Sequence, residues 1–144
     1  MPPPHLFWTH WLLAVSAGVV VFGLMLVVAP SLSRQGFSLL VYANPAAIDN
    51  FGPEQARYIS LTHAVIGSVM VGWGAALVYI TQTLFATGNP MGRHLIAVSL
   101  AAWFLPDTGY SLLSGFWQNA VLNGVFLAPF AIPLWASRPS GSPH

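Results

Sequence analysis

One carboxylate, Asp107, lies within the long apolar stretch of residues 100–127, in a chain of which only 5% of the residues are charged. An ionisable group inside a membrane is costly unless it finds partners, so such a residue is a functional-site hypothesis in its own right. A carboxylate there could bind the polar head of a ligand, carry a proton, or act as a general acid or base. Asp107 is therefore the first candidate catalytic residue, with His63 as a second that would tune it.

Three predicted helices bring polar side chains to the layer of Asp107. At a rise of about 1.5 Å per residue, His63, Asp107 and Asn123 each lie roughly 8–9 Å inward from the same end of their spans. Asn119, four residues before Asn123, points the same way, and Tyr110 follows Asp107 at i+3 on one stripe. Unsatisfied polar groups are costly in hydrocarbon, so these stripes should face the bundle interior. The sequence predicts a pocket in one leaflet.

Aromatic side chains should line the rest of this pocket. Trp73, Trp103 and Phe104 are the residues that we expect along the apolar tail of a ligand. The full candidate set for ligand binding is Asp107, His63, Tyr110, Asn119, Asn123 and Trp103.

A purely structural role for the same residues stays open. Asn, Ser and Thr side chains commonly join membrane helices by hydrogen bonds, and neighbouring polar groups can cap a buried carboxylate. No metal site is expected, because a lone intramembrane histidine is more often a hydrogen-bonded bundle residue than a ligand.

The composition indicates an integral membrane protein. Of the 144 residues, 56% are hydrophobic and none is lysine, whereas a soluble domain usually has about 25% charged residues. Four scattered arginines form no basic patch for nucleic acid. Cysteine is absent, which excludes disulfides and thiolate chemistry.

Four segments are long and apolar enough to cross a membrane, which takes about 20 helical residues. The predicted spans are residues 8–29, 56–85, 91–113 and 117–136. The fold class is therefore all-α: a polytopic membrane protein, with an antiparallel four-helix transmembrane bundle in a single domain of residues 1–144. The connection of residues 30–55 contains an apolar stretch too short to span, which predicts an interfacial or re-entrant segment.

The second span carries a small residue at every fourth position, which allows a neighbouring helix to approach closely. These residues are Ala64, Ser68, Gly72 and Ala76. Gly67 and Gly74 lie on the adjoining stripe of His63, where they leave room for a groove or for close packing.

Charged residues give an expected orientation. The side with the termini holds Arg93 and Arg138 and no acid, whereas the other side holds the same number of arginines, Arg34 and Arg57, together with Asp49 and Glu54. Because the loop on that other side is long and bears the acids, we expect both termini in the cytoplasm.

Two stretches resemble a family of small four-helix bacterial integral membrane proteins with no assigned activity. The first is Phe51-Gly-Pro-Glu-Gln-Ala-Arg-Tyr-Ile with residues 63–74, and the second is Trp103-Phe-Leu-Pro-Asp-Thr-Gly-Tyr and its continuation to Asn123. The resemblance covers most of residues 12–136. It implies four spans in a bacterial inner membrane, and it implies no activity, cofactor or site residue.

Three functions fit these observations, and the first is preferred. It is an accessory or structural subunit that packs in a larger membrane complex or self-associates. The second is a binding protein for a lipophilic small molecule such as a quinone, an isoprenoid or a pigment. The third is a small membrane enzyme with Asp107 as general acid or base. The absence of known catalytic motifs from the sequence argues against this third function. The sequence requires no cofactor. The expected partners are the lipid bilayer and other membrane subunits or a second copy, and no nucleic acid.

Overall fold

The computed structural model describes residues 4–137, and every regular element in that part is helical. In chain order the elements are α1 (Pro4–Val28), α2 (Pro30–Tyr42), the 3-10 helix η1 (Ala47–Asn50), α3 (Pro53–Ile80), the π-helical turn η2 (Thr81–Phe85), α4 (Pro90–Leu113) and α5 (Trp117–Ala136). Residues 1–3 and 138–144 lie outside the described part. Arg138, which contributed to the expected membrane orientation, is one of them.

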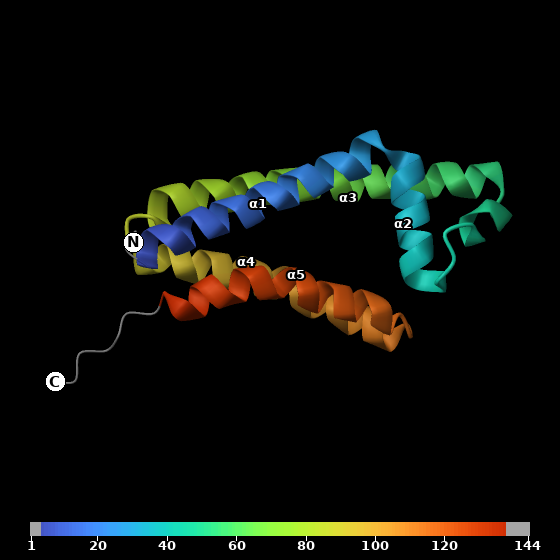
Figure 1. The fold of residues 1–144 in the computed structure, drawn as a ribbon. Helices are drawn as coiled ribbons and strands as arrows, with labels where there is room; N and C mark the ends of the chain where they lie inside the picture. The colour runs from blue at the N-terminus through green and yellow to red at the C-terminus, as the bar shows by residue number, and fades with distance from the viewer. Residues whose placement is uncertain (1–3, 138–144) are drawn as a thin grey trace.

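Four helices of the described chain are long and apolar enough to cross a membrane. The candidate spans are Leu6–Val28, Pro53–Phe85, Pro90–Leu113 and Trp117–Ala136. The predicted all-α, four-span architecture is confirmed. Consecutive spans run in opposite directions, so the beginning of α1 and the end of α5 lie at the same end as the turn between η2 and α4 (Figure 1).

Proline, asparagine and glycine define the helix ends. Pro53 and Pro90 begin α3 and α4, where a missing N–H costs no helical hydrogen bond. Asn89 caps α4, because its side-chain oxygen accepts a hydrogen bond from a first-turn N–H at 2.9 Å. Gly88 and Gly115 have φ angles of 74° and 82°, which glycine adopts without strain. These two glycines allow the tight turns before α4 and α5.

The predicted long loop is largely the helix α2. α1 ends at Val28, and Pro30 begins α2. The apolar stretch that was expected to lie on the bundle is only the C-terminal half of α2. Ser38 is buried, and its hydroxyl donates to the carbonyl of Asn44 at 2.7 Å, which closes the turn after the helix. In Figure 1, α2 runs across the direction of α1 and α3 toward α5.

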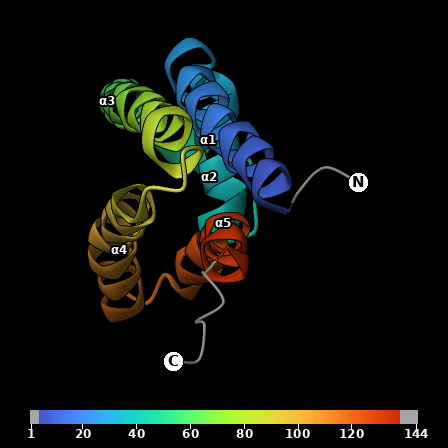
Figure 2. The ribbon, with the colours of Figure 1, turned by 90° about the vertical axis from the view of Figure 1, so that its left-hand side faces the viewer.

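The four spans associate as two pairs, α1 with α3 and α4 with α5 (Figures 1 and 2). The pairs meet near the chain ends and diverge toward the turn between α4 and α5, where α2 lies between them. The buried core joins α1, α3, η2, α4 and α5 on the side where the pairs meet. It consists of Leu12, Val19, Leu77, Phe85, Ile96, Leu100 and Phe130. The last three spans are therefore antiparallel as expected, but α3 and α4 adjoin chiefly near their connecting turn.

Close contact between α1 and α3 depends on glycine. A methyl group on Gly23 would lie 2.6 Å from the carbonyl oxygen of Gly67, and one on Gly74 would lie 2.7 Å from Val20 Cγ2. The prediction that the other small stripe makes the close contact is wrong. Its members Ser68, Gly72 and Ala76 are exposed, and nothing would lie within 4 Å of a methyl group on Gly72. Residue size alone does not tell which of two neighbouring stripes faces the partner helix.

A side chain of α1 also compensates for a proline of α5. Pro133 has no N–H, so the carbonyl of Pro129 loses its helical partner. The indole Nε1 of Trp11 donates to that carbonyl oxygen at 2.8 Å. The hydrogen bond links the α1/α3 pair to the α4/α5 pair at the end where they meet.

The glycine contact can be tested with a matched pair of substitutions on α3. Gly67→Ala forces α1 away from α3, and overpacking of this kind costs about 1–3 kcal/mol. Gly72→Ala meets open space and gains helix propensity, so its unfolding free energy should be equal to or higher than that of the unaltered protein. Thermal unfolding in mild detergent measures both. Equal stability of the two variants would contradict the α1–α3 contact.

Candidate functional site

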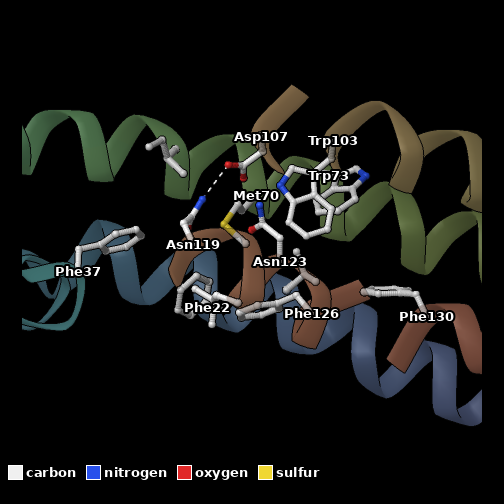
Figure 3. A pocket seen from close by; sticks show the side chains of 13 residues that line it. Phe22, Phe37, Met70, Trp73, Trp103, Asp107, Asn119, Asn123, Phe126 and Phe130 are labelled. Carbon is white, nitrogen blue, oxygen red and sulfur yellow. Dashed lines mark hydrogen bonds between the residues drawn. The ribbon is translucent and has the colours of Figure 1, made fainter. Parts of the chain in front are cut away.

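A partly open cavity of about 220 Å³ lies where the two helix pairs diverge. Apolar side chains of α1, α3 and α5 supply most of its wall, together with Phe37 of α2. Its polar lining comes from Asp107 of α4 and from Asn119 and Asn123 of α5, as Figure 3 shows. Asp107 and Asn123, which were predicted to share a layer, and Asn119, predicted to point the same way as Asn123, therefore line one cavity.

Asp107 is held by a hydrogen-bonded group at the α4–α5 contact. Nδ2 of Asn119 donates to Asp107 Oδ1 at 2.9 Å and to the hydroxyl oxygen of Ser111 at 2.8 Å. The hydroxyl of Ser111, which is buried, donates to the backbone carbonyl of Asp107 at 2.7 Å. One amide thus fixes the carboxylate and the neighbouring turn of α4 at once (Figure 3).

A second link between the helices lies deeper along α5. Asn123 is 4% exposed, and its Nδ2 donates to Oγ1 of Thr108 at 3.1 Å. Asn119 and Asn123 are four residues apart, so both amides lie on the face of α5 that meets α4. These two links set the position of the cavity's polar side.

In the side chains of Asp107, Asn119 and Asn123 the atoms left without a partner among the described residues are oxygens, whereas the indole Nε1 of Trp103 in the same cavity is a free donor. Both asparagines donate through Nδ2, which leaves their Oδ1 atoms, and Asp107 accepts through Oδ1, which leaves Oδ2. Among the described residues Asp107 forms no ion pair. The cavity therefore presents hydrogen-bond acceptors, one of them a carboxylate oxygen.

Aromatic rings form the apolar wall. The rings of Trp73 and Trp103 lie 5.6 Å apart, and the indole N–H of Trp73 donates to the hydroxyl of Ser99, which joins α3 to α4. Phe22 and Phe126 face each other with ring centroids 5.6 Å apart. The expectation that Trp73 and Trp103 line the pocket agrees with their positions, whereas the third expected ring, Phe104, lines a different groove between α4 and α5.

A second, almost wholly apolar cavity of about 420 Å³ adjoins the first between α1, α2 and α5. The two cavities share four lining side chains, namely Phe22, Phe37, Leu122 and Phe126. Together they offer a polar end at Asp107 and an apolar end beneath α2.

His63 does not line the cavity of Asp107. It is buried, and its ring stacks on Phe37 with centroids 4.6 Å apart and planes at 27°. Phe37 is part of the cavity wall, so His63 supports the site through that ring. Nearby, Arg34 donates to the hydroxyl of Ser60, which also fastens α2 to α3. Nδ1 of His63 has no partner among the described residues.

Tyr110 lies outside the cavity, with 73% of its surface exposed. Successive residues of a helix are rotated by about 100° around its axis. Tyr110, at i+3, therefore lies roughly 60° to one side of Asp107, and Ser111, at i+4, lies roughly 40° to the other side. Ser111 therefore joins the α4–α5 contact and Tyr110 does not. The sequence pattern also missed Phe37 and Met70 as lining residues, because no periodicity links α2 to this layer.

Within residues 4–137 no group of three His, Asp or Glu side chains is placed to hold a metal ion. No family model, no curated protein and no solved structure matches the chain. The four long apolar helices agree with the architecture that the resemblance implies, and no family is identified.

The link between Asn119 and Asp107 can be measured with a double-mutant cycle. Asn119→Leu and Asp107→Leu each break it, and the double variant should lose less stability than the sum of the two. Hydrogen bonds between membrane helices give coupling energies of roughly 0.6–1.7 kcal/mol, and we expect a value in this range. A parallel cycle of Asp107→Leu with Gln118→Leu is the control, because Gln118 forms no hydrogen bond with Asp107. Equal coupling in both cycles would contradict the assignment.

Proposed function

We propose that this multi-pass membrane protein binds an amphipathic, lipophilic small molecule whose head group donates a hydrogen bond to Asp107. The observation that carries the proposal is the Asp107 carboxylate in a cavity with aromatic walls, where, among the described residues, it forms no ion pair and its Oδ2 accepts no hydrogen bond. Buried or half-buried charges normally have a partner, because desolvation without one is costly. A ligand donor supplies that partner.

The free acceptors define the class of head group. The Oδ2 of Asp107 and the Oδ1 atoms of Asn119 and Asn123 need N–H or O–H donors. An alcohol, an amine or a quinol meets this need, whereas the carbonyls of a quinone only accept. Of the ligands that the composition suggested, a hydroxylated isoprenoid fits these atoms best.

The adjoining apolar cavity accounts for the tail. Small-molecule sites are largely apolar, with a few polar groups that fix orientation. The Asp107 cavity follows this pattern, and a chain that leaves it past Phe22 and Phe37 enters the space between α1, α2 and α5. A branched or linear hydrocarbon tail is therefore accommodated beneath α2.

The other two functions gain less support. Of the described side chains that line the cavity, Asp107 alone titrates, so acid–base catalysis lacks a second group there. A role as an accessory subunit remains a prediction, since exposed apolar side chains are common to all membrane-spanning helices. The proposal keeps a bacterial inner membrane with both termini cytoplasmic as its setting. Both described ends of the chain lie at one end of the bundle, which supports termini on the same side of the membrane (Figure 1). The cytoplasmic side follows from the acid-bearing loop, and the bacterial membrane from the resemblance.

Farnesol and farnesyl methyl ether test the head group, because a methyl group replaces the hydroxyl hydrogen in the ether, whose oxygen can then only accept. A hydrogen bond to a charged group is worth about 1.5–3 kcal/mol, so the protein should bind farnesol about ten-fold or more tightly than the ether. Fluorescence of Trp73 and Trp103 in detergent reports the binding. In Asp107→Asn the preference should fall to about three-fold or less, while Asp49→Asn in the loop keeps it. Equal affinity of the unaltered protein for both compounds would overturn the proposal.

The tail cavity is tested at Gly36, which lines it and has no atom within 4 Å of a built methyl group. Gly36→Phe should fill the cavity and weaken the binding of farnesol and of its ether by similar factors. The ratio of the two affinities should therefore stay the same. Gly18→Phe on α1, where a side chain also meets open space, is the matched control. Unchanged affinity in Gly36→Phe would show that the tail lies elsewhere.

A further inference from the structure

Arg93, in the first turn of α4, is a cation without a carboxylate partner in the described chain. Its Nη2 donates to the carbonyl of Ser137 just past α5 at 2.7 Å, and its Nε is buried without a partner. The acids Asp49 and Glu54 lie in the opposite half of the molecule, before and at the start of α3, and Asp107 lies roughly 21 Å further along α4. A guanidinium has five N–H donors, and one of them is used here.

Arg93 stands at the end of an apolar groove between α4 and α5. The groove has a volume of about 440 Å³ and follows Ala97, Ala101 and Leu105 along α4, with Trp135 beside its Arg93 end. From Arg93 to Leu105 it extends for roughly 18 Å of helix. It shares no lining residue with the Asp107 cavity. The small side chains of the two alanines leave the space, and the lining is otherwise almost entirely hydrocarbon and aromatic.

We propose that this groove binds an anionic phospholipid, with the phosphate at Arg93 and one acyl chain along the alanine side of α4. Charge complementarity selects the head group: planar guanidinium groups match phosphate oxygens, and within residues 4–137 no carboxylate pairs with Arg93. The position of Arg93 also supports a phospholipid as the occupant of the groove, because Arg93 lies at the end of a candidate span, where lipid head groups are found. Trp135 is a typical interfacial residue at the same level.

Native mass spectrometry of the detergent-solubilised protein, titrated separately with phosphatidylglycerol and phosphatidylcholine, tests the head-group contact. The protein should bind phosphatidylglycerol more tightly, and Arg93→Gln should lower that affinity about ten-fold. The affinity for phosphatidylcholine should fall less, because its choline cation already offsets the charge of the phosphate. Arg57→Gln, at an exposed arginine of α3, should leave both affinities unchanged. Equal binding of the two lipids by the unaltered protein, or unchanged affinity in Arg93→Gln, overturns the proposal and leaves Arg93 as a cap of α5 only.

A second variant tests the groove without touching Arg93, which also holds the end of α5. Ala101→Leu fills the groove and should weaken phosphatidylglycerol binding several-fold. Ala102→Leu adds the same group at the next exposed position, which does not line the groove, and should have no effect. If Ala101→Leu and Ala102→Leu bind phosphatidylglycerol equally, the acyl chain does not occupy the groove and the proposal fails. This comparison is decisive even if Arg93→Gln does not fold.

Discussion

Polar groups inside the membrane layer have little water to bond, so the protein must supply their partners, and this constraint organises the bundle. The indole of Trp11 bonds the carbonyl that Pro133 leaves free, and Trp73 bonds Ser99. Each of these contacts joins one helix pair to the other. Elsewhere, serine and threonine hydroxyls donate hydrogen bonds to backbone carbonyls four residues earlier in the chain, as Thr81 does to Leu77. The polar atoms that have no hydrogen-bond partner among the described residues are therefore informative.

Some of those exceptions lie at the open side of the bundle, whereas others, such as Ser16 Oγ and Arg93 Nε, lie elsewhere. The amides of Asn119 and Asn123 use their donors to hold α4, and this leaves acceptor oxygens beside the Asp107 carboxylate. The two helix pairs diverge there, where α2 crosses, so the oxygens face a cavity and not a packed interface. A site that accepts hydrogen bonds and has apolar walls follows from this arrangement.

Hydropathy predicted the four spans, and helical rise predicted the shared depth of Asp107 and Asn123. These features depend on length and helical rise, which the sequence states directly. The direction in which a side chain points around its helix depends on which helices pair. That is why Tyr110 faces outward, His63 lies behind Phe37, and α1 meets the stripe of Gly67 instead of that of Gly72. No local pattern predicted α2 as a wall of the site.

The most direct measurement is the lipid content of the protein purified in mild detergent from its native membrane, determined by mass spectrometry. The account predicts one lipophilic species with a hydroxyl or amine head, enriched over its share in the bulk membrane extract and depleted in Asp107→Asn. A lipid profile identical to that of the bulk membrane, and unchanged by Asp107→Asn, would contradict it.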